Sequence, residues 1–101
     1  KTVESYMFIA IVPLGCSEKV IEAANEAGAT GATVMRGRGI AKPAKEGFFS
    51  FHVEPEEDIV IIIASKEVIE KMSHRLYNEF KTNIKRGGSI YIMPVQSYDN
   101  L

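Results

Sequence analysis

The segment 58–64 constrains the fold of this chain most strongly, because residues 59–63 are apolar at every position. A strand with one face in water alternates apolar and polar side chains, whereas a continuous apolar run is typical of a strand buried on both faces. Two helices can cover only one face of a small sheet, so we expect further copies of the chain to cover the other. The alternative is that the outward isoleucines are exposed, which is unusual in monomers because contiguous apolar patches are rare there.

The rest of the chain divides into short strands and two helices. Apolar residues recur at helical spacing over residues 20–27 and 68–80. Ser17 is predicted to be the N-cap of the first helix, Gly28 to end it, and Ser65 to open the second. The order β-α-β followed by β-α-β predicts an α+β fold, a ferredoxin-like βαββαβ sandwich with an antiparallel sheet. The predicted strands are 5–12, 31–36, 48–53, 58–64 and 89–93.

Composition and charge exclude several classes of function. The 101 residues carry a formal net charge of -1, which provides no global field to attract nucleic acid or an acidic membrane. A single cysteine, Cys16, allows no internal disulfide and favours a reducing, cytoplasmic setting. The apolar stretch 6–12 is expected to be a strand rather than a signal peptide. No apolar run approaches the ~20 residues that span a bilayer, so the protein is not expected to be membrane-embedded.

Residues that carry chemistry are scarce. His52, His74 and Cys16 are far apart in the sequence and show no metal-ligand spacing. The acidic residues of 54–58 lack the alternating ligands and glycine of a calcium loop, so a solvated turn is expected there. No acid–base pair stands out. We therefore expect no catalytic residues, no metal site and no prosthetic group.

Two basic, glycine-containing loops follow or precede predicted strands, at residues 36–39 and 85–88. Glycines let a ligand approach the backbone closely, arginines pair with phosphate, and consecutive amides form anion-binding concavities. Each loop alone is equally well explained as a plain turn. Together, in an oligomer, they indicate a phosphate-bearing ligand at the subunit boundaries.

A rival signal lies in residues 45–53, which loosely resemble the aromatic strand of an RNA recognition motif. In that family this strand runs directly into the second helix, whereas here the strand 58–64 intervenes. The phenylalanines of this segment are expected to pack a hairpin or an interface instead.

Segments spread over nearly the whole chain resemble the nitrogen regulatory P-II family and its P-II-like relatives. The most specific stretch is 27–39, which contains the sequence GATGATV followed by the Arg38-Gly39 pair. The other matching segments are the strand 8–13, the helical residues 19–24, the strand 59–64 and the residues 87–90 and 94–95.

The resemblance implies a homotrimer of single-domain subunits, residues 1–101, that bind ATP, ADP or AMP in the clefts between subunits. It also implies a short T-loop, at about 39–57, which changes shape with the ligand and engages a target, and a phosphate-binding B-loop at 82–89. By position, the nucleotide-binding residues are Thr33, Arg38 and Gly39; Ile61, Ile62, Ile63 and Ala64 through their backbone; and Lys85, Arg86, Gly87, Gly88 and Ser89. The partner-binding loop is Ile40, Ala41, Lys42, Pro43, Ala44 and Lys45.

The function expected from this resemblance is regulation of a protein partner, such as a metabolic enzyme or a transporter, in response to an adenine nucleotide. Two alternatives remain at this point. One is a metal-handling or small-molecule-binding trimer of the copper-tolerance type, against which the missing His/Cys cluster argues. The other is a single-stranded RNA-binding module.

Overall fold

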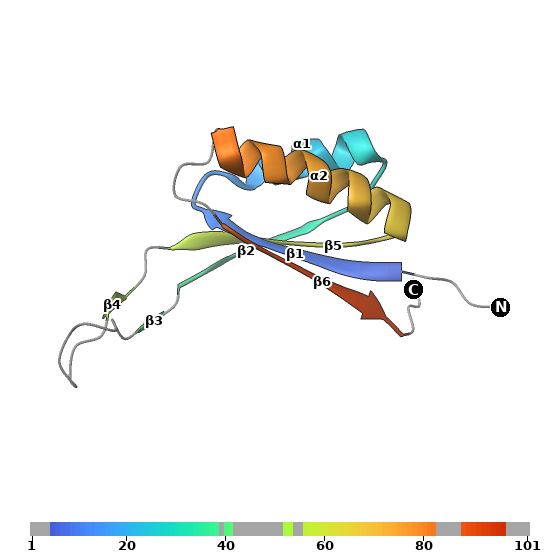
Figure 1. Ribbon diagram of the computed structural model, residues 1–101. Coiled ribbons are helices and arrows are strands. Elements are labelled where there is room, and N and C mark those ends of the chain that lie inside the picture. The colour runs from blue at the N-terminus through green and yellow to red at the C-terminus, as the bar shows by residue number, and fades with distance from the viewer. Residues whose placement is uncertain (1–4, 39, 42–51, 54–55, 83–87, 97–101) are drawn as a thin grey trace.

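The computed structural model describes residues 5–38, 40–41, 52–53, 56–82 and 88–96. Two helices lie on one face of a four-stranded antiparallel sheet, which confirms the predicted α+β ferredoxin-like class (Figure 1). The elements, in chain order, are β1 (Ser5–Pro13), α1 (Ser17–Ala27), β2 (Thr33–Gly37), β3 (Ile40–Ala41), β4 (His52–Val53), β5 (Glu57–Ala64), α2 (Lys66–Thr82) and β6 (Ser89–Val95).

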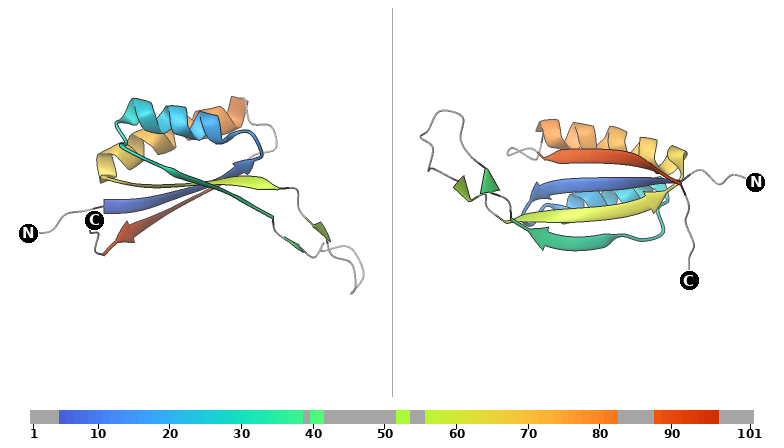
Figure 2. Two further views of the ribbon diagram at one scale, coloured as in Figure 1. Left: turned by 180° about the vertical axis from the view of Figure 1, so that it is seen from behind. Right: turned by 90° about the horizontal axis from the view of Figure 1, so that it is seen from below.

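The strand order of the main sheet is β2-β5-β1-β6, with every neighbouring pair antiparallel. β5 therefore occupies an interior position, as its continuous apolar sequence predicts. One row across the sheet joins Thr33, Ile61, Ile9 and Tyr91. The two views of Figure 2 show both helices on one side of this sheet and no element of the described chain on the other.

The core lies between the helices and the sheet. Every second residue of the two interior strands is buried there, because side chains of a strand alternate between its faces. The core consists of Phe8, Ala10 and Val12 of β1, Val60 and Ile62 of β5, Val20, Ala23 and Ala24 of α1, and Ile69, Met72 and Leu76 of α2. Across the helix pair, Arg75 reaches Glu22 at 3.8 Å and contacts Glu26. The hydrogen bond to Glu26 raises the pKa of Arg75.

The helix boundaries confirm two sequence predictions and correct one. Gly28 ends α1 in the left-handed conformation, with φ of 97°, and Ser65 precedes α2 and accepts the backbone N–H of Val68 at 3.4 Å. The predicted N-cap Ser17 is wrong. Ser17 is already the first helical residue, Cys16 occupies the N-cap position, and no side chain caps the helix there.

The strand boundaries also differ from the prediction. β6 continues through Pro94 to Val95, where the sequence predicted an end. A proline is tolerated because β6 is an edge strand and its free side needs no backbone donor. Of the strand predicted at 48–53, the described part is β4, and it pairs with Ile40 and Ala41. Ile40 and Ala41, the first two residues of the expected partner-binding loop, therefore form a short strand, β3, which the sequence did not predict.

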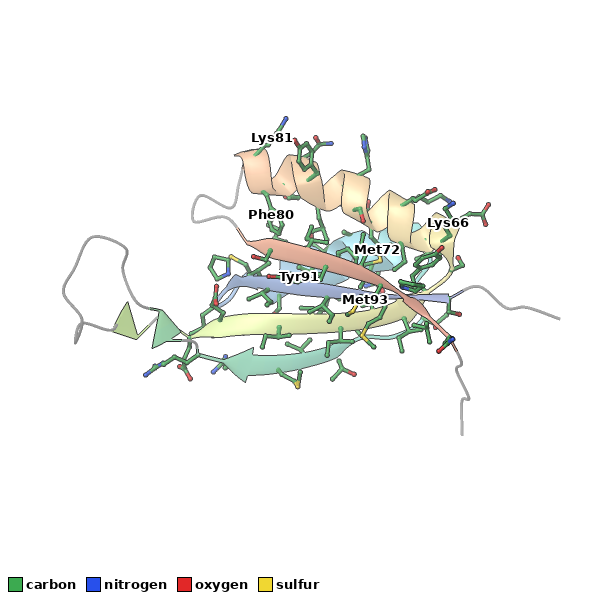
Figure 3. The ribbon with its side chains drawn as sticks, turned by 60° about the horizontal axis from the view of Figure 1, so that its bottom comes forward. Lys66, Met72, Phe80, Lys81, Tyr91 and Met93 are labelled. Carbon is green, nitrogen blue, oxygen red and sulfur yellow. The ribbon has the colours of Figure 1, made fainter. Side chains whose placement is uncertain are left out.

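The face of the sheet away from the helices is apolar and uncovered within one chain. Ile59, Ile61 and Ile63 are half-buried on this open face, and Tyr91 is 52% exposed. Figure 3 looks toward this side and shows Tyr91 and Met93 of β6 among its side chains. The open face comprises Met7, Ile9 and Ile11 of β1, Met35 of β2, the three isoleucines of β5, and Tyr91 and Met93 of β6.

Gly88 should resist substitution, because it sits tightly against the end of β1. A Cβ atom there would lie 2.7 Å from the carbonyl oxygen of Ile11 and 3.2 Å from the ring of Phe80. We expect Gly88→Ala to lower the free energy of unfolding by about 1–3 kcal/mol, measured by urea denaturation. Gly31→Ala is the matched control, because a Cβ at Gly31 meets nothing within 4 Å. Equal stability of the two variants would contradict this account of Gly88.

Candidate functional site

A polar-rimmed hollow of 200 Å³ lies where the turn after α1 enters β2. Three of the residues predicted to bind nucleotide, Thr33, Ile61 and Ile63, line it. The register explains why they meet: Thr33 faces Ile61 across the β2–β5 pair, and Ile63 follows two residues later on the same face. The turn residues Thr30, Gly31 and Ala32 complete the lining.

Ile62 and Ala64, the other two residues of β5 predicted to bind nucleotide, face the core instead of the hollow. The Ile62 side chain is buried in the core, so only its backbone remains for the role that the resemblance implies. Ala64 is half-buried and packs against the core, opposite Tyr6 of β1. The alternation of the strand thus divides the predicted run 61–64 between the two faces of the sheet.

Arg38 lies at the far end of β2, in an acidic setting. Its guanidinium is 3.9 Å from a carboxylate oxygen of Glu56. Arg36, two residues earlier, lies 3.6 Å from Asp58. Asp58 is the one buried charged residue in the described part of the chain, and it also accepts the backbone N–H of Gly15 at 2.9 Å. Asp58 therefore ties the β1–α1 turn to the base of the segment between β2 and β5.

Gly88 and Ser89 lie at the same end of the sheet as Arg38, but on the opposite edge. Ser89 is exposed and pairs with Ile11, and Gly88 packs against that residue's carbonyl group. Gly88 is therefore required by packing, whatever its role toward a ligand. The remaining predicted site residues, Gly39, Lys42, Pro43, Ala44, Lys45, Lys85, Arg86 and Gly87, lie outside the described residues.

One chain keeps the parts of the predicted site apart. Arg38, one residue beyond the end of β2, is five positions from Thr33, or about 17 Å at ~3.3 Å per residue. Across the sheet, β5 and β1 stand between β2 and β6, which places the two edges about 14 Å apart at ~4.8 Å per strand. The hollow, Arg38 and the start of β6 cannot therefore close around a single small ligand within one chain.

Sequence reasoning missed several residues of this region. Thr30, Gly31 and Ala32 carry part of the family resemblance but were not assigned to the site, although the turn sequence GATG marks a place where backbone is accessible. Asp58 and Glu56 were interpreted as part of a solvated acidic turn. Their pairing with arginines of β2 depends on the register between strands distant in sequence, for which the acidic run alone gives no signal.

A neighbouring hollow of 240 Å³ shares Thr30, Gly31 and Ala32 with the first and extends toward α1. Another, of 330 Å³, is lined by Tyr6, Lys66, Ile69, Glu70, Ser73 and Ile92, on the helix side of β6. None of the predicted site residues lines it. Within the described ranges, no cluster of three or more His, Cys, Asp or Glu side chains is arranged to hold a metal ion. Over the same ranges, none of the helices combines the length and the apolar character needed to cross a membrane.

Removal of the Asp58 carboxylate should destabilise the fold. Asp58→Ala leaves the Gly15 N–H without its acceptor and Arg36 without its partner. We expect a loss of about 1.5–3 kcal/mol in the free energy of unfolding, which is the usual contribution of a hydrogen bond to a charged group. Urea denaturation measures it, and Glu57→Ala, at the preceding position of β5, is the control. A loss no larger than that of the control would refute the anchoring role of Asp58.

The structure resembles solved structures of P-II-type proteins over most of its length. A PII-like signalling protein from Thermus thermophilus is 22% identical, with a TM-score of 0.69, covering 92% of this chain and 88% of that one. The GlnK–ATP complex from B. subtilis is 19% identical, with a TM-score of 0.69 and coverages of 92% and 83%. CPII from Thiomonas intermedia, a nitrogen regulatory PII-like protein bound to ADP, AMP and bicarbonate, is 14% identical, with a TM-score of 0.70 and full coverage of both chains.

These identities establish a shared fold, and the sequence itself establishes the family. A comparison with curated proteins gives no match. A family model described as "Nitrogen regulatory protein P-II" matches residues 6–101, which is nearly the whole chain and includes the hollow, both basic loops and the apolar strand β5. The chain therefore belongs to the nitrogen regulatory protein P-II family.

Proposed function

We propose that this protein is a non-enzymatic signalling regulator that binds an adenine nucleotide between the subunits of a homotrimer. The observation that carries the proposal is the hollow beside β2, because three of the residues predicted from the sequence line it together. Two structurally similar proteins support the ligand class: GlnK was solved with ATP, and CPII with ADP and AMP.

The separation of the site within one chain favours a ligand held between two copies. In this proposal the hollow of one subunit receives the base, and the basic residues Arg38, Lys85 and Arg86, drawn from the two adjoining subunits, hold the phosphates. A di- or triphosphate in a cleft needs fixed cations and aligned amides, and these loops are where the sequence concentrates both. Gly39, Gly87, Gly88 and Ser89 contribute backbone there, and the nucleotide acts as a regulatory ligand without a prosthetic group.

The apolar open face supplies the driving force for the proposed trimer. Its nine apolar residues come from all four strands of the sheet, and within one chain no described element covers them. Burial of apolar surface contributes about 25 cal/mol per Å², so covering such a face stabilises a domain of this size substantially. The mutual burial of three such faces is the arrangement we propose.

The segment 40–45 is proposed to contact the partner, a metabolic enzyme or a transporter, and the T-loop to span about 39–57. Of this span, the described residues beyond the main sheet include β3 and β4, which pair with each other as a short two-stranded ribbon (Figure 1). A ribbon that begins next to Arg38 is suited to transmit the state of the phosphate site to a bound protein. We propose a single domain over residues 1–101 that acts in the cytoplasm, in keeping with its one cysteine.

A charge in the middle of the open face should dissociate the proposed trimer. Ile9 lies in the central row of that face and its side chain is only half-buried in one chain, so the monomer tolerates Ile9→Lys. We expect light scattering at micromolar concentration to give three chain masses for the wild type and one for the variant. Tyr77→Lys on the helix layer, where Tyr77 is 60% exposed, is the control and should remain trimeric. A wild-type mass of one chain would overturn the assembly.

Filling the hollow should block the nucleotide. Gly31 lines the hollow and a Cβ there meets nothing within 4 Å, so we expect Gly31→Leu to crowd the hollow while the fold is kept, which thermal unfolding of the variant checks. We expect calorimetry to detect ATP, ADP or AMP binding to the wild type below millimolar dissociation constants, and Gly31→Leu to weaken it at least tenfold, or about 1.4 kcal/mol. Gly31→Ala is the size control. No binding of any of the three by the wild type would refute the nucleotide proposal, and parallel titrations with single-stranded RNA and metal ions would test the alternative ligands.

A further inference from the structure

Two ion pairs join β2 to the start of β5 at the base of the β3–β4 ribbon. Arg36 and Asp58 face each other in the strand register, with a nitrogen-to-oxygen distance of 3.6 Å. Arg38 lies two residues after Arg36, Glu56 lies two residues before Asp58, and their charged groups are 3.9 Å apart. Because the strand register ends at Gly37 opposite Glu57, this second pair forms an outer rung just beyond the paired strands, and Arg36 with Asp58 forms the inner one.

The two rungs differ in how firmly each carboxylate is held. The Asp58 side chain is only 6% exposed and it also accepts the Gly15 N–H. Loss of Arg36 would leave that buried carboxylate without its counter-charge, which is costly. The outer rung lies in solvent, with the side chains of Arg38 and Glu56 55% and 47% exposed. Exposed pairs of this kind contribute about 0–1 kcal/mol, so the outer rung opens easily whereas the inner one does not.

We propose that Glu56 is an internal competitor of the nucleotide phosphates for Arg38, and that it thereby sets the affinity of the site. The inference rests on the proposed function, in which Arg38 holds phosphate. A carboxylate and a phosphate both bind the N–H edges of a guanidinium, and Glu56 lies beside the Nη2 group of Arg38. A phosphate that binds this edge therefore displaces Glu56, and its binding energy is reduced by the energy of the displaced pair. Arg36 is itself 67% exposed, but a phosphate that displaced Asp58 from it would leave a buried carboxylate without its counter-charge, so the competition concerns Arg38.

The proposal makes Glu56 a determinant of affinity rather than a contact of the ligand. Replacement of Glu56 by the isosteric glutamine removes the competitor and leaves Arg38 free. Because an exposed pair of up to about 1 kcal/mol is removed, the expected gain is about two- to fivefold in affinity. Only a ligand whose phosphate reaches Arg38 gains affinity when Glu56 is replaced. The affinity for adenosine, which has no phosphate, should therefore be the same in Glu56→Gln and the wild type.

The test compares Glu56→Gln with Glu57→Gln by calorimetry with ATP, on the full chain. Glu57 carries the same charge one residue along β5, but it lies opposite Gly37, which has no side chain to pair with. Glu57→Gln therefore reports the general effect of removing one negative charge near a phosphate. We expect ATP to bind Glu56→Gln two- to fivefold more tightly than the wild type. The affinity of Glu57→Gln for ATP should stay close to that of the wild type. Thermal unfolding verifies that both variants fold.

A second readout follows the arginine itself. The Arg38 Nε–H resonance in NMR should shift when ATP is added to the wild type, and should already be displaced toward a free guanidinium in Glu56→Gln before ATP is added. Equal ATP affinities for the two glutamine variants, or an Arg38 resonance that Glu56→Gln leaves unmoved, would overturn the competition while leaving nucleotide binding intact. Failure of the wild type to bind ATP, ADP or AMP would instead refute the proposed function, and this inference with it.

Discussion

The antiparallel pairing of β5 with β1 is the interaction on which the rest of the structure depends. It runs from Tyr6 opposite Ala64 to Pro13 opposite Glu57, and it forms the centre of the sheet. Because side chains alternate along a strand, a slip of one residue would send every side chain of β5 to the other face. Asp58 would then leave the Gly15 N–H, and Ile62 would leave the core. The register thus determines the buried carboxylate, the core and the apolar open face together.

The same register explains which parts of the fold could be predicted from the sequence. β5 is predictable because its apolar run is continuous and fits no alternating or helical pattern. Gly28 and Ser65 are predictable as helix boundaries because each acts through local backbone conformation or hydrogen bonding. The cap at Ser17 was wrong because capping signals next to a turn are ambiguous by one position, and the β1–α1 turn here brings Cys16 to the cap. β3 was missed because its pairing with β4 is not visible in a segment rich in glycine and lysine.

The candidate site shows the same division between local and non-local information. Thr33, Ile61 and Ile63 were available to prediction through the family resemblance, and the period of two in β5 then explains why Ile62 is turned into the core. The pairing of Glu56 and Asp58 with arginines was not available, because it joins segments about 20 residues apart whose relative register comes from the sheet. Gly88 adds a further complication: a glycine near a basic loop indicates a ligand, yet its contact with Ile11 alone requires the absence of a side chain.

A site divided between copies makes ligand binding and assembly parts of one equilibrium. In the proposed arrangement the hollow beside β2 and the basic loop before β6 belong to different subunits, so only the assembled protein presents a complete site. A ligand that binds the assembly and not the separated chains stabilises the assembly in proportion to its occupancy. In this proposed arrangement the apolar open face would supply cohesion that does not depend on the ligand, whereas the charged pair of Arg38 and Glu56 would respond to it. Because these charges lie at the base of the β3–β4 ribbon and the apolar face lies on the sheet, the ligand could act on the ribbon while the proposed trimer stays intact.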